Sequence, residues 1–128
     1  MKLIIAGSRG VTKYQTVRLA FRRFRYRRAV TTIVSGKAPG VDTLGEEVAD
    51  EYGLEIMAKP ADWLTYGKRA GYIRNGEMAE VADALLAIWD GKSPGTKQMI
   101  KLALAKGLYV EVYSDRGDRL FSGYGTAA

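Results

Sequence analysis

The sequence predicts a Rossmann-like α/β domain, a three-layer sandwich whose five-stranded, mainly parallel sheet has the strand order 3-2-1-4-5. Three observations lead to this prediction. Short apolar runs alternate with segments of helical periodicity along the chain. Glycine-containing loops directly follow two of the apolar runs. At 128 residues the chain is long enough for one hydrophobic core, and it shows no internal repeat and no linker.

The chain opens with a predicted strand, a glycine loop and a helix. Lys2–Ala6 is an apolar run, and the sequence Gly7-Ser8-Arg9-Gly10 follows it at once. This order is typical of the first unit of a nucleotide-binding α/β fold, although one such loop is a weak signal by itself. Arg9 is either a phosphate ligand, through its forked guanidinium donors, or a solvated loop arginine.

A helix is expected from about Lys13 to Arg28. Its apolar residues recur at helical spacing, at Val17, Ala20, Phe21 and Phe24. Arginines occupy a different stripe, at Arg18, Arg22 and Arg25. The formal charge of +6 is concentrated in this segment. The basic stripe is either a solvated face or a surface for nucleic acid or an acidic partner.

Thr31–Ser35 and Leu54–Ala58 are the second and third predicted strands. A glycine loop and a helix that ends near Tyr52 connect them. Gly36 leaves the second strand and is a candidate for close contact with a ligand. Asp42 has two interpretations: it caps the helix, or it binds a ribose hydroxyl, as acidic residues near nucleotide loops do.

The segment 59–81 is interrupted by proline and glycines, so we expect a loop followed by a helix from about Ile73. Arg74 lies on the same face of this helix as the apolar residues Met78 and Val81. An arginine on such a face either reaches solvent at the edge of the core or points along the carboxyl edge of the sheet toward a ligand. We favour the ligand.

The fourth predicted strand, Asp83–Ile88, runs into the loop Trp89–Gln98 and then into a helix that ends near Lys106. The loop carries Asp90, Gly91, Ser93, Gly95 and Thr96. Its glycines allow close backbone approach, and a helix N-terminus favours an anion such as phosphate. An ordinary turn with a hydroxyl N-cap is the alternative. The loop is not a Walker A motif, because Leu86 stands where that motif requires its first glycine.

In a sheet of this order, the loops after the first and fourth strands flank one crevice at the carboxyl edge. These loops contribute the predicted phosphate ligands Gly7, Ser8, Arg9, Gly91, Ser93, Gly95 and Thr96. We therefore predict a site for a nucleotide or a nucleotide-derived phosphate ligand, with Asp42 near the ribose. No cofactor is required, but magnesium could accompany the nucleotide near Asp90 through water.

Residues 1–113 form the predicted domain, which ends with a fifth strand over Leu108–Tyr113. Residues 114–128 are rich in glycine, serine and charge, so we expect a flexible or loosely docked tail. The chain has no cysteine and no histidine, which excludes disulfides and thiolate or imidazole catalysis. The apolar start is too short for a signal peptide or a membrane span, so a cytoplasmic location is expected.

Five short motifs occur in order along the chain, at 5–9, 35–42, 60–63, 70–75 and 89–96. Together they resemble the small SLOG proteins, the YspA/YpsA-related group common in bacteria and phages, over about Lys2–Tyr113. The resemblance implies a Rossmann-like domain related to the DNA-processing protein DprA and to the LOG phosphoribohydrolases. It also implies a nucleotide or nucleotide-derived ligand. Related Rossmann-like proteins often form homo-oligomers through surface helices.

The chain departs from the LOG enzymes at their glutamate. The resemblance places Met99 where the LOG motif has the glutamate that assists cleavage of the base–ribose bond, and it matches Arg74 to an active-site arginine. Hydrolysis would then need a displaced carboxylate, at Glu77, Asp42 or Asp90. The leading hypothesis is therefore nucleotide binding for sensing or sequestration. The alternatives are a LOG-like N-glycosidase that uses Arg74 and Glu77, and DprA-like nucleic-acid binding through the arginine-rich helix.

Overall fold

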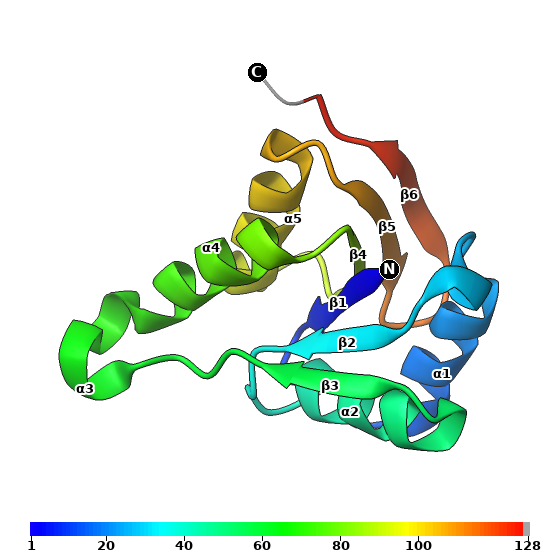
Figure 1. Cartoon of the computed structure of the whole chain (residues 1–128), viewed down its shortest axis with the longest axis horizontal. Helices are drawn as coiled ribbons and strands as arrows, with labels where there is room; N and C mark the ends of the chain where they lie inside the picture. The colour runs from blue at the N-terminus through cyan, green and yellow to red at the C-terminus, as the bar shows by residue number, and fades with distance from the viewer. Residues whose placement is uncertain (127–128) are drawn as a thin grey trace.

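Six strands form one sheet, in the order β3-β2-β1-β4-β5-β6, in the computed structural model, which describes residues 1–126 (Figure 1). The strands are β1 (Lys2–Gly7), β2 (Thr32–Ser35), β3 (Glu55–Ala58), β4 (Ala84–Trp89), β5 (Tyr109–Ser114) and β6 (Arg119–Tyr124). The first five are parallel, and β6 runs antiparallel to β5. The predicted Rossmann-like α/β fold and the order of its first five strands are confirmed.

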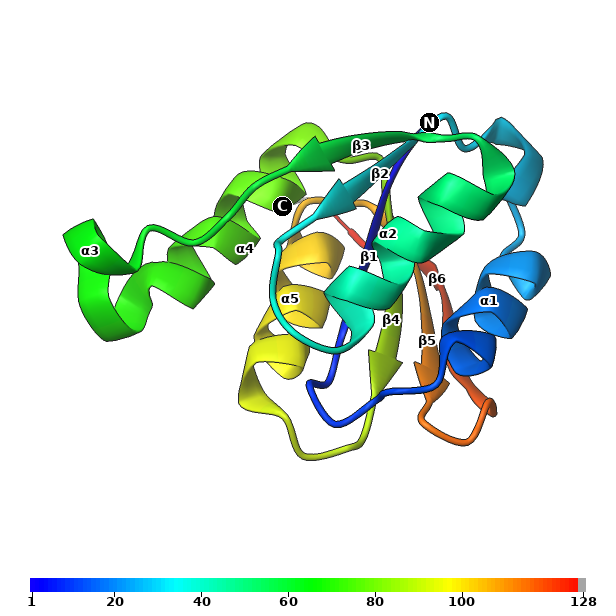
Figure 2. The ribbon, with the colours of Figure 1, turned by 90° about the horizontal axis from the view of Figure 1, so that it is seen from below.

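Helices cover both faces of the sheet (Figure 2). They are α1 (Tyr14–Arg23), α2 (Val41–Tyr52), α3 (Trp63–Tyr66), α4 (Ala70–Val81) and α5 (Pro94–Ala105), with 3-10 turns η1 (Arg27–Ala29) and η2 (Gly67–Arg69). Side chains of α1 and α2 pack into one apolar cluster, and those of α4 and α5 pack into a second. Leu3, Ile4 and Ile5 of β1 are fully buried because a central parallel strand is covered on both sides.

The carboxyl ends of β1 and β4 lie unusually close together. Gly7 pairs with Ile88, and a Cβ at Gly7 would lie only 2.1 Å from the Ile88 carbonyl oxygen. The Ser8 N–H donates to that oxygen at 3.0 Å, and the Ser8 hydroxyl accepts a hydrogen bond from the Asp90 N–H at 3.1 Å. Glycine is therefore required sterically at position 7, and the two loops leave the sheet from adjoining points.

The predicted number of five strands is wrong, because residues 119–124 of the predicted tail form a sixth strand, β6. A tight turn joins this strand to β5: the Ser114 N–H donates to the Asp118 carbonyl at 2.7 Å, and Gly117 has φ +90°. The strand adds main-chain hydrogen bonds along β5, which would otherwise be the edge of the sheet. Residues 127–128 of the predicted tail lie outside the described part of the chain.

The first helix is shorter than predicted. It ends at Arg23, and Phe24 adopts an extended conformation with ψ 129°. The cause is a buried acceptor on the sheet, because the Arg25 N–H donates to a carboxylate oxygen of Glu111 at 2.9 Å. Phe24 still packs into the core, as the apolar spacing predicted.

The segment from α3 to the start of α4 projects from the body of the molecule (Figures 1 and 2). Asp62 is the N-cap of α3 and accepts a hydrogen bond from the Thr65 N–H at 3.1 Å. Helix α4 begins at Ala70, three residues earlier than expected. Within residues 1–126, no helix has the length and apolar character needed to cross a bilayer.

Candidate functional site

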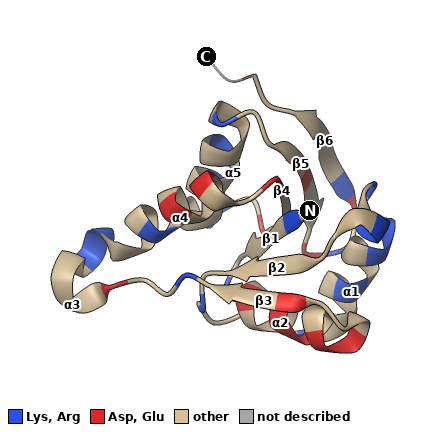
Figure 3. Ribbon diagram, viewed as in Figure 1, with Lys and Arg blue, Asp and Glu red and all other residues tan. Residues whose placement is uncertain are grey.

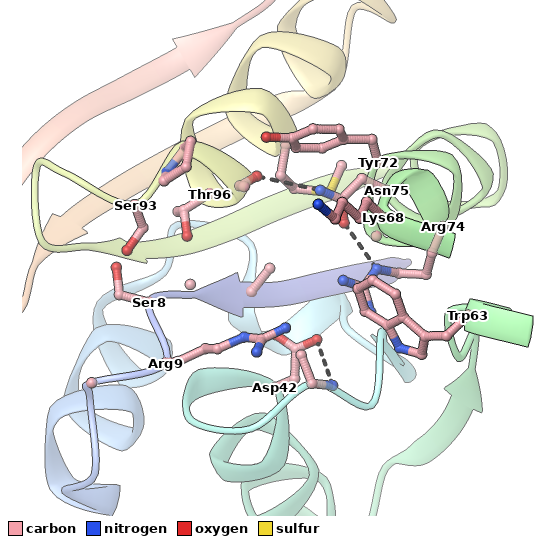
Figure 4. Close-up of a pocket in the computed structure, with 18 residues that line it drawn as sticks. Ser8, Arg9, Asp42, Trp63, Lys68, Tyr72, Arg74, Asn75, Ser93 and Thr96 are labelled. Atoms are coloured by element: carbon pink, nitrogen blue, oxygen red, sulfur yellow. Dashed lines mark hydrogen bonds between the residues drawn. The ribbon is translucent and has the colours of Figure 1, made fainter. Parts of the chain in front are cut away.

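A cavity of about 390 Å³ opens at the carboxyl edge of the sheet (Figure 4). Its walls come from the loops after β1, β2 and β4 and from the helices α2, α3, α4 and α5. It is lined by Ala6, Gly7, Ser8, Arg9, Gly10, Ala38, Asp42, Trp63, Lys68, Gly71, Tyr72, Arg74, Asn75, Ser93, Pro94, Gly95, Thr96 and Met99. The cavity therefore lies where the strand order predicts a crevice.

The structure brings most of the predicted site residues together. Those that line the cavity are Gly7, Ser8, Arg9, Asp42, Arg74, Ser93, Gly95 and Thr96. Gly36, Glu77, Asp90 and Gly91 are not among the lining residues. Gly36 lies directly behind the cavity, because a Cβ at that position would lie 2.7 Å from both the Arg74 Nη1 and the Asp42 Oδ2. Glu77 is exposed on α4.

One end of the cavity is formed by the N-terminus of α5. Pro94 is the first residue of this helix, and no acidic side chain lies in its first turn. The N–H groups of Gly95 and Thr96 belong to the first turn, where amides have no intrahelical acceptor and carry the positive end of the helix dipole. Ser8 faces this helix end from the opposite wall (Figure 4). This arrangement favours an anionic group.

Asp90 organises the loop before α5. Its carboxylate accepts hydrogen bonds from the N–H groups of Lys92 and Ser93, each at 2.8 Å, and from the Ser93 hydroxyl at 2.9 Å. The bonds from the Ser93 and Lys92 backbone lower the pKa of Asp90 to about 2. Because these bonds occupy both carboxylate oxygens, Asp90 supports the shape of the loop.

Arg74 is buried at the floor of the cavity, with only 9% of its surface exposed. Its Nε donates to the Asn75 side-chain oxygen at 3.0 Å, and its Nη1 donates to the Gly36 carbonyl at 2.5 Å. Within residues 1–126, no hydrogen bond uses its Nη2 group. Burial lowers the pKa of Arg74, an effect that Asp42 opposes and Arg9 reinforces. A fixed cation thus lines the cavity.

Asp42 is also buried, with 4% of its surface exposed. Its carboxylate accepts a hydrogen bond from the Ala38 N–H at 3.3 Å. Burial raises its pKa to about 6, although the charge of Arg74 acts in the opposite direction. The alternative in which Asp42 caps α2 is wrong, because Gly40 is the N-cap, with φ 84° and no side-chain cap. Asp42 instead lines the cavity, and Arg9 extends toward it (Figure 4).

The outer wall of the cavity was not predicted. Trp63, Lys68 and Tyr72 come from the projecting segment, and Trp63 is 52% exposed. The motif at 60–63 is one of those that carry the family resemblance, but only the structure shows which side chains of this stretch line the cavity. Asn75, also missed, links the walls: its side-chain amide donates to the Gln98 oxygen on α5 at 2.7 Å.

The charges of the lining residues are unequal. Three cations line the cavity, Arg9, Lys68 and Arg74, whereas Asp42 is the one carboxylate among the lining residues of the described chain. Met99 is buried and lines the cavity, at the position where the resemblance placed the LOG glutamate. The cavity therefore combines a cationic surface with a single carboxyl group, and it suits an anion better than it suits acid–base chemistry by a carboxylate pair.

These features define a Rossmann-like domain with a cationic crevice at the carboxyl edge of its parallel strands. The chain belongs to the YspA, cpYpsA-related SLOG family, whose model matches residues 1–66. It is also similar to the Gene 61 protein of Mycobacterium phage D29, with 32% identity over 90 residues, which span 66% of this chain and 72% of that protein. No solved structure gives a significant match.

Proposed function

We propose that the protein binds a nucleotide or a nucleotide-derived phosphate ligand in the cavity. The observation that carries this proposal is the convergence of the buried Arg74, Arg9 and the N-terminus of α5 on one space of about 390 Å³. Such a volume is within the range of small-molecule sites and suits one nucleotide. Membership of the SLOG family supports a nucleotide-related ligand.

The lining residues suggest an orientation for the ligand. The phosphate would lie between Ser8 and the first turn of α5, where hydroxyl and N–H donors face each other. The base would lie toward Trp63 and Tyr72, whose rings offer apolar faces. Asp42, between these ends, would accept a hydrogen bond from a ribose hydroxyl. Magnesium remains a prediction, and it would arrive with a di- or triphosphate because Asp90 is already engaged by its own loop.

Two points support binding over cleavage: the resemblance places Met99 where the LOG enzymes have their glutamate, and Glu77 is not among the residues that line the cavity. The biological use would then be sensing or sequestration of a nucleotide signal. Cleavage of the base–ribose bond is a second candidate, favoured by one observation: the pKa of Asp42 is raised to about 6, in the range where a carboxyl group can exchange a proton near neutral pH.

The test is incubation of the purified protein with nucleoside mono-, di- and triphosphates, followed by chromatography of the bound and free fractions. We expect an intact nucleotide in the bound fraction, with retention lost in Arg9→Ala and Thr96→Val. Lys101→Ala is the matched control, because Lys101 is exposed on α5 and does not line the cavity. Free base that accumulates with time would show an N-glycosidase, and no retention of any nucleotide would contradict the proposal.

Gly36→Ala is expected to weaken nucleotide binding about tenfold without unfolding the protein. The added Cβ would lie 2.7 Å from the Arg74 Nη1 and from the Asp42 Oδ2, so both side chains must move. Isothermal titration measures the effect on affinity. Gly76→Ala is the matched control, because a Cβ there meets nothing within 4 Å. Equal affinity in the two variants would show that neither Arg74 nor Asp42 contacts the ligand.

A further inference from the structure

A second basic surface lies at the opposite end of the molecule from α3 (Figure 3). We call it the arginine face and define it as Arg22, Arg23, Arg25, Arg27, Arg28, Arg116 and Arg119. Two acids, Asp115 and Asp118, lie in the adjoining β5–β6 turn. In the part of the chain that the structure describes, no arginine of this face forms an ion pair with a carboxylate. The face therefore keeps a strong positive charge. Without an anionic partner, its arginines repel one another.

The arginine face is held in place by the sheet beneath it. Glu111 is fully buried, and it accepts hydrogen bonds from the Arg25 N–H at 2.9 Å and from the hydroxyl groups of Tyr109 and Tyr113 at 2.7 and 2.9 Å. The Arg23 guanidinium lies 5.1 Å from the centroid of the Tyr113 ring and donates to the Gly117 carbonyl. The end of α1 and the β5–β6 turn are thus joined into one ordered surface.

A hollow of about 310 Å³ lies within the face. It is lined by Arg22, Phe24, Arg25, Tyr26, Arg27, Arg28 and Ala29. Four of the lining residues are arginines, and an arginine-lined hollow suits phosphate because the guanidinium fork matches two phosphate oxygens. None of these residues lines the cavity at the carboxyl edge, so the hollow is separate from that cavity.

Aromatic rings adjoin the arginines. Tyr26 lines the hollow, and the centroid of the Tyr124 ring lies 6.4 Å from that of Tyr26. Tyr124 is 61% exposed on β6. An exposed aromatic ring next to guanidinium groups is the combination that binds single strands, because unpaired bases stack on the ring while cations contact the backbone. A duplex offers no such base face, and an acidic protein surface does not need the ring.

We propose that the arginine face binds single-stranded nucleic acid. The phosphate backbone follows the hollow between α1 and η1, and a base stacks on Tyr124. This activity is independent of the nucleotide cavity. The two proposals together give the protein two anion-binding sites, one for a small ligand and one for a polymer.

The test measures fluorescence anisotropy of a labelled 20-nucleotide single strand between 50 and 200 mM NaCl. We expect binding that weakens steeply with salt, with a log–log slope of about −0.7 for each phosphate contact. A variant with Arg25→Ala, Arg27→Ala and Arg28→Ala should bind at least about tenfold more weakly at 50 mM, with a slope shallower by about 2. A variant with Lys59→Ala, Lys97→Ala and Lys101→Ala removes the same charge elsewhere and should keep the wild-type slope.

Tyr124→Leu separates stacking from charge. It should weaken single-strand binding about fivefold or more and leave binding to a duplex of the same length unchanged. Circular dichroism confirms that each variant is folded. The proposal is overturned if the folded protein does not bind the strand at 50 mM NaCl, or if the arginine and lysine variants lose equal affinity. It is also overturned if Tyr124→Leu weakens single-strand and duplex binding equally, or if phosphatidylserine vesicles bind the face while the strand does not.

Discussion

Arg74→Met should weaken binding of the retained nucleotide by at least about 100-fold, roughly 3 kcal/mol. The reason is the placement of the guanidinium group: it is buried at the cavity floor and fixed by Asn75 and Gly36, and no acceptor within residues 1–126 engages its Nη2 donors. A charge-assisted hydrogen bond in such a site is stronger than one in water. Isothermal titration with the nucleotide found by chromatography measures the change.

Two variants accompany Arg74→Met. Arg69→Met removes an exposed arginine just before α4, outside the cavity lining, and should leave the affinity unchanged. Arg74→Lys keeps the charge but loses the fork, so it should give an intermediate loss of about tenfold. Arg74→Met should also lower the melting temperature, because it leaves the buried Asp42 carboxyl without its neighbouring cation and the Gly36 carbonyl without its donor, so affinity is compared at a temperature where both proteins are folded. A wild-type affinity in a folded Arg74→Met variant would place the ligand elsewhere.

Local sequence patterns predicted the first five strands of the fold but not the sixth. Continuous apolar runs such as Ala84–Ile88 identify strands buried on both faces, and parallel order follows from the alternation with helices. Residues 119–124 are mostly exposed, so they carry no continuous apolar signal. Residues 119–124 form a strand because the turn at Gly117 brings them alongside β5, whose edge they pair with. That edge exists only in the assembled sheet, so the local sequence does not reveal it.

The candidate site likewise contains residues that could be predicted from the sequence and residues that could not. Residues next to strand ends, such as Ser8 and Thr96, could be predicted because topology alone places them at the crevice. Arg74 was predicted from an arginine on an otherwise apolar helix face. Trp63 and Tyr72 could not be placed, since their orientation depends on how a projecting segment folds back over the cavity. Glu77 lies on the exposed side of the same helix. Its side could not be predicted, because glycines interrupt the apolar pattern that would show which face of the helix points inward.

Asp42→Asn should raise the free energy of unfolding by about 2–3 kcal/mol at pH 7.5 and leave it nearly unchanged at pH 4. The folded state raises the pKa of Asp42 from its ordinary 3.8 to about 6, because burial disfavours the charged form. The folded protein therefore binds this proton more tightly than the unfolded chain does. The corresponding stability is complete below about pH 4 and is lost as the pH rises through 6. Asparagine remains neutral, so it avoids this loss.

Urea denaturation of both proteins at the two pH values measures the effect, and the difference between the proteins cancels the titration of other groups. Asp50→Asn is the matched control, since Asp50 is an exposed aspartate on the same helix and its replacement should change the stability little. A variant that is less stable than the wild type at pH 7.5 would show that Arg74 fully compensates the buried carboxylate.

The same variant connects stability to function. A carboxylate that destabilises the fold at neutral pH, next to an arginine and inside a cavity, is expected where a ligand requires it. Asp42→Asn should therefore bind the nucleotide about tenfold more weakly while it unfolds at a higher urea concentration, because an amide is a weaker acceptor for a ribose hydroxyl than a carboxylate. If the variant gains stability and keeps its affinity, Asp42 does not contact the ligand, and Arg9 and Arg74 alone would account for binding.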